Sequence, residues 1–213
     1  MSVGNPTNEN VYHPVPASAL SQTARNLTSV TGLEVGSLAA QPASGSVAVS
    51  VQRSGNFFAL TFTLAAARIS VTDGAGSGSH GSLTFFTFNP VAISFLGARQ
   101  NYTAFAEGAA LTGAAGDAVF EIGVGTTAIS AAADGTLGNG VNENVGQAVS
   151  VTLSGGTGTG TAVDGAKTTA LDGTSTAISL RLNWSGTAAT IDASSTIDVT
   201  GTITVCGVML GDD

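Results

Sequence analysis

The stretch Thr196-Ile-Asp-Val-Thr-Gly-Thr-Ile-Thr-Val-Cys-Gly-Val-Met209 indicates the fold more clearly than any other part of the chain. Its apolar side chains recur at every second residue, and threonine or aspartate fills most positions between them: Ile197, Val199, Ile203, Val205 and Met209 against Asp198, Thr200, Thr202 and Thr204. Because successive side chains of a β-strand point to opposite faces, this alternation predicts one long strand with one buried face. Gly201 and Gly207 interrupt the apolar face, and we expect a β-bulge or a close approach of another backbone there.

The same period of two extends over most of the chain from Ser46 onward. Similar runs lie at residues 47–51, 58–64, 69–71, 83–88, 91–96, 100–106, 120–124, 149–153 and 178–184. Turn residues such as Asp73-Gly74 separate the runs, and no pattern of alternating strands and helices is present. About nine or ten strands of this kind predict an all-β fold, a jelly-roll-like antiparallel β-sandwich whose core is the alternating Val, Ile, Leu and Phe faces.

Three stretches are predicted to be loops because glycine, serine, asparagine and aspartate dominate them: residues 73–82, 131–144 and 154–161. The first is rich enough in glycine to suggest a phosphate-binding loop. It lacks the terminal Lys-Ser/Thr pair of that motif and no helical pattern follows it, so we expect a flexible or contact-forming loop instead.

Residues 1–44 differ from the rest, and we predict an extended N-terminal arm there, with the β-sandwich domain at 45–213. The arm holds four of the five prolines, and proline restricts both itself and the residue before it to extended conformations. A leader without fixed structure is the alternative. We expect the arm to contact a neighbouring subunit through Val11, Tyr12, His13, Pro14, Val15 and Pro16.

Composition excludes several classes of partner. The chain of 213 residues carries 6 Lys plus Arg against 14 Asp plus Glu, a formal net charge of −8, and its basic residues are scattered singly. Nucleic acids and anionic membrane surfaces both need clustered basic side chains, so neither is expected. No run reaches the roughly 18 apolar residues of a membrane-spanning helix, and the first residues lack the pattern of a signal peptide. We therefore expect assembly in a cytoplasm and, given so little charge, a surface largely covered by neighbours.

Residues capable of catalysis or metal binding are few, and we predict no catalytic, cofactor or metal site. His13 and His80 have no second ligand near them in sequence, and the single cysteine, Cys206, is expected to be a small buried residue. For calcium, one loop offers oxygen ligands without the spacing of an EF-hand: Asp134, Asn139, Asn142 and Glu143. A turn is the expected role of that loop, with a bound cation as the alternative.

A pair of carboxylates would suffice for a glycosidase, and Glu107, Asp117 and Glu121 lie close in sequence. Sugar clefts are usually lined with aromatic side chains, however, and the chain offers few candidates for such a lining, namely Trp184 and Tyr102. Hydrolysis is therefore not expected, and carbohydrate binding without hydrolysis stays open.

Several local stretches resemble a group of small virion proteins of tailed bacteriophages. They are Gly-Ser-Leu-Thr-Phe-Phe-Thr-Phe at 81–88, Leu-Gly-Ala-Arg-Gln-Asn-Tyr-Thr-Ala-Phe at 96–105, Phe-Glu-Ile-Gly-Val-Gly-Thr-Thr at 120–127, and the segments 139–144, 182–188 and 196–203. The resemblance covers roughly residues 65–210 and leaves the arm unmatched. It implies a head decoration or cement protein, often trimeric, that binds the major capsid protein where capsid subunits meet. The location implied is the capsid exterior, after assembly in the host cytoplasm.

Two functions follow as expectations from different classes. The first is a structural virion protein that decorates and cements a capsid. The alternative is a receptor- or glycan-binding module of a tail fibre or vertex spike, which would expose a site involving Trp184, Tyr102 or the Asn-rich loops. An enzyme using Glu107 or Glu121 is a third, less favoured by the composition.

Overall fold

A computed structural model describes residues 35–73, 79–107, 118–129, 137, 142–153, 157–158, 162–164, 170–173, 175–186 and 195–211. Every regular element in these ranges is a β-strand, and the strands of the described residues pair antiparallel. The strands are β1 (Gly36–Leu38), β2 (Ser46–Ser54), β3 (Phe57–Asp73), β4 (Ser79–Phe88), β5 (Ala92–Glu107), β6 (Ala118–Gly125), β7 (Gly146–Leu153), β8 (Thr157–Gly158), β9 (Ala162–Asp164), β10 (Ala170–Leu171), β11 (Ser179–Gly186) and β12 (Ser195–Gly211).

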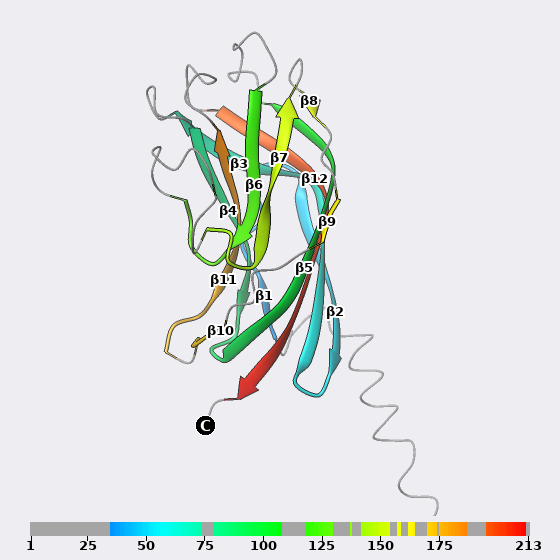
Figure 1. Ribbon diagram of the computed structural model, residues 1–213, viewed down its shortest axis with the longest axis vertical. Helices are drawn as coiled ribbons and strands as arrows, with labels where there is room; N and C mark the ends of the chain where they lie inside the picture. Colours follow the sequence, from blue (N-terminus) through cyan, green and yellow to red (C-terminus); the bar gives the residue numbers. More distant parts are fainter. Residues whose placement is uncertain are drawn as a thin grey trace, which may run out of the picture.

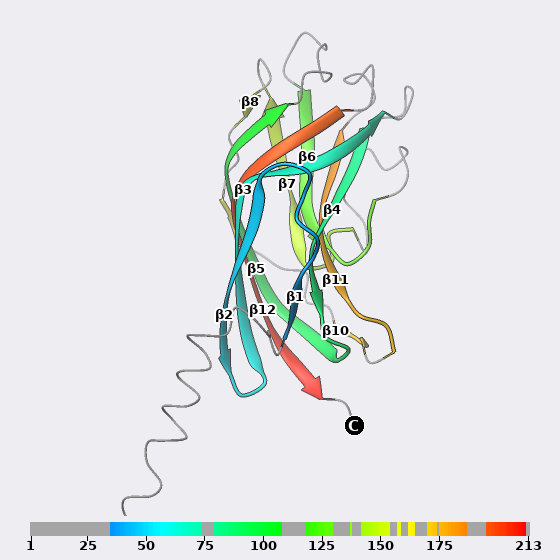
Figure 2. The same cartoon turned by 180° about the vertical axis from the view of Figure 1, so that it is seen from behind.

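The strands form one hydrogen-bonded sheet that curls into two layers (Figures 1 and 2). The order along the sheet is β10-β5-β12-β3-β4-β11-β6-β7, with β2 beside β3, β1 beside β4, and β8 and β9 beside β5. β3 and β4 pair only where Val71–Asp73 meet Ser79–Gly81, so the sheet passes from one layer to the other at this corner. The expected all-β antiparallel sandwich of jelly-roll-like form is confirmed for the described residues.

Aromatic side chains fill the space between the two layers. The ring of Phe62 on β3 lies 4.8 Å from that of Phe85 on β4, and Phe105 on β5 lies 6.0 Å from Trp184 on β11. The alternating faces predicted from the sequence are buried: Phe58, Leu60, Phe62 and Leu64 on β3; Leu180, Leu182 and Trp184 on β11; and Ile197, Val199, Ile203 and Val205 on β12. Burial of apolar area on this scale is the main stabilising term of such a core.

β12 keeps one phase of alternation from Ile197 to Met209, and over this range its two neighbours adjust to it with β-bulges. Between Met209 and Gly211 the register with β5 shifts once more, with the extra residue on β12 itself. Along β3 the buried positions change from even to odd numbers between Leu64 and Ala67, where the pairing with β12 shifts and Ala66 takes a positive φ of 51°. Along β5 the pairing shifts opposite Gly201 and again opposite Gly207. Each bulge adds one unpaired residue, so the strand can bend while both of its halves still bury apolar side chains.

Gly201 and Gly207, the two glycines that interrupt the apolar face of β12, lie at these irregular positions, as expected. A Cβ on Gly201 would lie 2.3 Å from the carbonyl oxygen of Asn101, and a Cβ on Gly207 would lie 2.4 Å from the ring of Phe58. The prediction of a bulge or a close approach is therefore confirmed at both residues.

Some predicted boundaries are wrong. The runs at 58–64 and 69–71 belong to the single strand β3, and those at 91–96 and 100–106 to the single strand β5, because a bulge interrupts alternation without ending a strand. Ser79–Ser82, predicted as loop, are the first part of β4, since pairing with β11 supports this glycine-rich backbone. Thr157–Gly158, also predicted as loop, pair with β5.

The predicted arm lies mostly outside the described residues, which begin at Val35. Val35 is buried in the core, and Gly36–Leu38 pair with β4, so the sheet already includes residues numbered below 45. For residues 1–34 the extended arm stays a prediction, as does the division into an arm and a sandwich domain.

Candidate interaction surfaces

Buried polar side chains hold two loops against β11. Asn183 is fully buried, and its side chain donates hydrogen bonds to the carbonyl oxygens of Thr127 at 2.9 Å and Asn142 at 2.7 Å. Its side-chain oxygen accepts a bond from the backbone N–H of Ile129 at 3.2 Å. The side-chain oxygen of Asn144 accepts a hydrogen bond from the backbone N–H of Thr126 at 3.0 Å. These bonds satisfy the buried N–H of Ile129 and three part-buried backbone groups of the loops, which is a structural role.

A second buried polar contact joins the two layers. The hydroxyl of Tyr102 donates to the side-chain oxygen of Gln100 at 2.7 Å, and the side-chain nitrogen of Gln100 donates to the carbonyl oxygen of Gln147 on β7 at 2.6 Å. Burial raises the pKa of the Tyr102 phenol well above its usual range, because the phenolate would lose its hydration there. Tyr102 is therefore a neutral donor that holds the side chain of Gln100, and Gln100 in turn joins β5 to β7.

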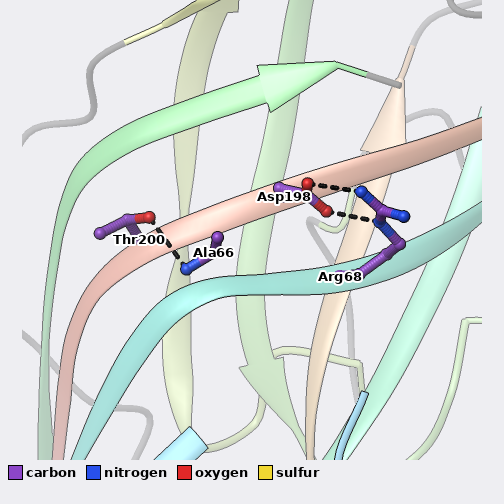
Figure 3. Close-up of polar contacts among 4 residues, drawn as sticks. All are labelled: Ala66, Arg68, Asp198 and Thr200. Carbon is purple, nitrogen blue, oxygen red and sulfur yellow. Dashed lines mark hydrogen bonds and ion pairs between the residues drawn. The ribbon is translucent and has the colours of Figure 1, made fainter. Parts of the chain in front are cut away.

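An ion pair and a hydroxyl contact join β3 to β12 beside the bulge at Ala66 (Figure 3). Two nitrogens of the Arg68 guanidinium each contact an oxygen of Asp198 at 2.7 Å, and the N–H of Ala66 donates to the hydroxyl of Thr200 at 3.1 Å. The bond to Asp198 raises the pKa of Arg68. Because two bonds join the planar guanidinium to the carboxylate, they fix the orientation of Arg68 relative to Asp198. The pair therefore holds β3 against β12 at the point where the alternation of β3 changes phase.

The residues considered for catalysis or metal binding do not form a cluster, and two of them make hydrogen bonds that hold the fold. His80 lies within β4 and not in a loop, and the carboxylate of Glu121 accepts a bond from the N–H of Leu137 at 2.7 Å. Glu143 is buried and accepts a bond from the N–H of Ala148 at 2.6 Å. The side chains of Glu107 and Asp117, with His13, Asp134 and Asn139, lie outside the described residues. In the described ranges no three His, Cys, Asp or Glu side chains gather as a metal site would require.

The glycan-binding alternative expects an exposed aromatic site at Trp184 or Tyr102, and for these two residues the expectation is wrong. Trp184 is fully buried, with its ring centroid 4.7 Å from that of Phe120 and the two rings tilted by 31°, and Tyr102 is also buried. Neither presents a face to a ligand at the surface. Burial follows from strand phase, since both share a face with the core side chains of β11 and β5.

Four buried polar atoms of β4 and β11 have no hydrogen-bond partner: Ser79 Oγ, His80 Nδ1, Ser82 Oγ and Trp184 Nε1. Ser79 and Trp184 lie on the core face of their strands, whereas His80 and Ser82 alternate with core positions and face the other way. The four atoms therefore do not converge on one site.

The outer face of the β3–β12 layer carries the features that sequence reasoning missed. Phe57 and Leu210 alternate with core residues and are exposed, as is Leu96. Cys206, expected to be buried, is a half-buried free thiol on the same face. One signal was available: on β12 the residues opposite the core change from threonine, at Thr202 and Thr204, to apolar types further along.

The six predicted partner-binding residues, Val11, Tyr12, His13, Pro14, Val15 and Pro16, lie outside the described residues, so their role stays a prediction. No protein-family model, curated protein or solved structure matches the chain. Among the described residues no helix is long and apolar enough to cross a membrane.

Proposed function

We propose that the chain is a structural virion protein that decorates a phage capsid and cements it by binding at junctions between major capsid protein subunits. The proposal starts from the resemblance of residues 65–210 to small phage virion proteins. We also propose that the chain forms a homo-oligomer on the capsid exterior, and the resemblance implies that this oligomer is a trimer.

The main structural support is that the described polar side chains serve to hold the fold. Asn183, Gln100 and Glu143 bind backbone groups, and Arg68 pairs with Asp198. The outer face of β3 and β12 offers threonine, alanine and apolar side chains, and no charged residue lies within 57–67 or 201–210. Such a surface loses little hydration when a neighbour covers it, which favours contact over chemistry.

The receptor- or glycan-binding alternative has less support. Its predicted aromatic site at Trp184 and Tyr102 is part of the core. The Asn-rich loop contributes Asn142, whose carbonyl oxygen accepts a bond from Asn183. No observation on the described residues favours this alternative over cementing.

The first test is the copy number of the chain in purified particles relative to the major capsid protein, measured by quantitative mass spectrometry. Cementing predicts copies in numbers comparable to the capsid subunits. A handful of copies would place the chain on a tail or vertex and favour receptor binding, and its absence from particles would refute a virion role.

The second test addresses the arm. Deleting residues 1–16 should weaken binding to capsids while leaving the thermal unfolding of the β-domain unchanged. The control is the full chain in the same pull-down with capsids. Equal binding by both proteins would contradict a role for Val11–Pro16 in the contact.

A further inference from the structure

β2 is an edge strand, because among the described residues it pairs with β3 alone. Both overall views show it at the margin of its layer (Figures 1 and 2). In an antiparallel pair the backbone N–H and C=O groups of alternate residues point away from the partner strand. Along β2 these outward groups form an edge to which a further strand can bond, and soluble proteins normally protect such an edge.

The residues that direct their backbone groups outward can be identified. The N–H of Val47 donates to the side-chain oxygen of Gln41 at 2.9 Å, so it points away from β3. Because the direction alternates along a strand, the backbone groups of Val49 and Val51 point the same way as those of Val47. Gln41 thus protects the edge at Val47, and the next two outward positions are where another segment can pair.

The core is only partly closed along this edge. Val47 is 5% exposed, whereas Val49 and Val51 are half-buried and pack against the rim of the core. A strand beside β2 would place its own side chains next to these two valines and exclude more water from them. The edge therefore favours an extended segment with apolar side chains at alternate positions.

Residues 11–16, which lie outside the described residues, have a backbone pattern that fits such an edge. Pro14 and Pro16 have no backbone N–H. In a strand, residues two apart direct their backbone groups to the same side, so this side lacks donors at both positions. The odd-numbered residues keep their N–H groups on the opposite side. A strand of this kind bonds to a sheet on one side only, which is why proline is found on edge strands.

The side chains of the segment agree with this phase. Residues directly opposite each other in a sheet share a face, so pairing through the odd-numbered residues places Val11 and Val15 on the face of Val49 and Val51. The prolines then lie on the far side of the added strand, where missing donors leave less edge for any further chain.

We propose that residues 11–16 of one copy add a strand to the edge of β2 in a neighbouring copy. The inference rests on the homo-oligomer of the proposed function and does not depend on capsid binding. A trimer is a ring, and its head-to-tail contact needs two different surfaces on each copy. The segment and the β2 edge are two such surfaces. Residues 17–34, which separate the segment from the described chain, span about 60 Å when extended, enough to reach a neighbour.

The test is the mass of the purified chain, without capsids, by sedimentation equilibrium over a range of concentrations. The full chain should form a closed oligomer, a trimer where the order implied by the resemblance holds, and deletion of residues 1–16 should give a monomer. A full chain that is monomeric at every concentration would overturn the exchange between copies. An oligomer that survives the deletion would place the contact elsewhere and overturn it too.

Two proline variants test which side of the segment pairs. His13→Pro removes an N–H from the pairing side and should raise the dissociation constant about tenfold or more relative to His13→Ala. Tyr12→Pro is the matched control: it removes an N–H from the other side and should associate as Tyr12→Ala does. Equal losses from both prolines would contradict the proposed phase. Neither residue belongs to the described fold, so thermal unfolding of the β-domain should stay unchanged.

A mixing experiment tests the edge itself. Val51→Pro removes an N–H that points away from β3, so the pairing of β2 with β3 should persist. This variant keeps the segment and loses the edge, whereas the deletion variant keeps the edge and loses the segment. Each should be monomeric alone, and together they should form a one-to-one complex. No complex between two folded variants would overturn the proposal, and if Val51→Pro fails to fold, the variants of residues 12 and 13 still decide.

Hydrogen exchange identifies the copy that holds the segment. The N–H groups of Val49 and Val51 should exchange more slowly as protein concentration rises, and deletion of residues 1–16 should abolish this dependence. Protection that requires residues 1–16 but does not change with concentration would place the segment on its own copy and overturn the exchange. None of these outcomes alters the copy number in particles, so failure of this inference is distinguishable from failure of cementing.

Discussion

Gly201 shows how a single residue can fix the packing of three strands. Its Cα lies so close to β5 that an added Cβ would be 2.3 Å from the carbonyl oxygen of Asn101 and 2.8 Å from the Cα of Tyr102. Both obstacles are backbone atoms, which cannot move aside as the end of a flexible side chain can. The bulges of β3 and β5 meet β12 at this point. A residue without a side chain is therefore a condition for the bend.

Gly201→Ala should lower the free energy of unfolding by about 2–3 kcal/mol, the usual range for overpacking a well-filled site. Chemical denaturation of parent and variant measures the difference. Gly97→Ala is the matched control, because a Cβ there meets nothing within 4 Å, and its effect should stay within about 1 kcal/mol. Similar losses for both variants would contradict the argument from close approach.

Tyr102 predicts how the stability changes at alkaline pH. Its folded pKa is raised by burial, so above about pH 10 the unfolded chain releases the phenol proton while the folded chain retains it. The folded state then binds more protons, and stability falls as pH rises, by about 1.4 kcal/mol per pH unit. Below the unfolded pKa this contribution is constant.

Denaturant unfolding between about pH 8 and pH 11 tests this dependence. Tyr102→Phe should have a lower stability at neutral pH, because the side-chain oxygen of Gln100 loses its donor. The same variant should also lose most of the alkaline slope. An unchanged slope in the variant would mean that another group causes the dependence.

At the scale of elements, β12 is the regular strand around which its neighbours are adjusted. Its seven odd-numbered positions from Ile197 to Met209 all face the core, whereas β3 and β5 change phase by bulging. The sequence of β12 was therefore easy to interpret. Those of β3 and β5 appeared to be separate short strands, because a period of two cannot be followed across a bulge.

β11 has a second role, which is to hold loops through Asn183. Asn183→Ala removes partners from the buried N–H of Ile129 and from the part-buried carbonyl oxygens of Thr127 and Asn142. We expect a loss of about 2–4 kcal/mol in the free energy of unfolding, since each unsatisfied buried group costs about 1–3 kcal/mol and the loops can relax in part. Hydrogen exchange should become faster at the N–H of Ile129.

Asn101→Ala, at a half-buried position on β5, is the control for this variant. It should leave exchange at Ile129 unchanged. If Asn183→Ala lowered global stability without any faster exchange in residues 126–129, the loop-holding role would be wrong.

At the scale of the whole molecule, the described surface predicts that contacts depend little on salt. The stretches 57–67 of β3 and 201–210 of β12 carry no charged residue, so a contact made through them has no ion pair to screen, although the Debye length falls from about 10 Å at 0.1 M to about 3 Å at 1 M. Binding of the chain to capsids, as proposed above, should therefore weaken little as salt rises. Co-sedimentation with capsids at both salt concentrations measures it, and a marked weakening at high salt would indicate a charged contact instead.

The sequence alone determined the all-β class and the buried face of most strands, because alternation is a local property that each strand carries in its own residues. It did not determine that β3 and β5 are single bulged strands, that Gln100 and Asn183 lie inside, or that Phe57 and Leu210 lie outside. Those outcomes depend on which distant segment covers each face, and only the tertiary structure decides that. Burial is a property of a residue together with its neighbours in space, and in a sandwich most of those neighbours lie far away along the chain.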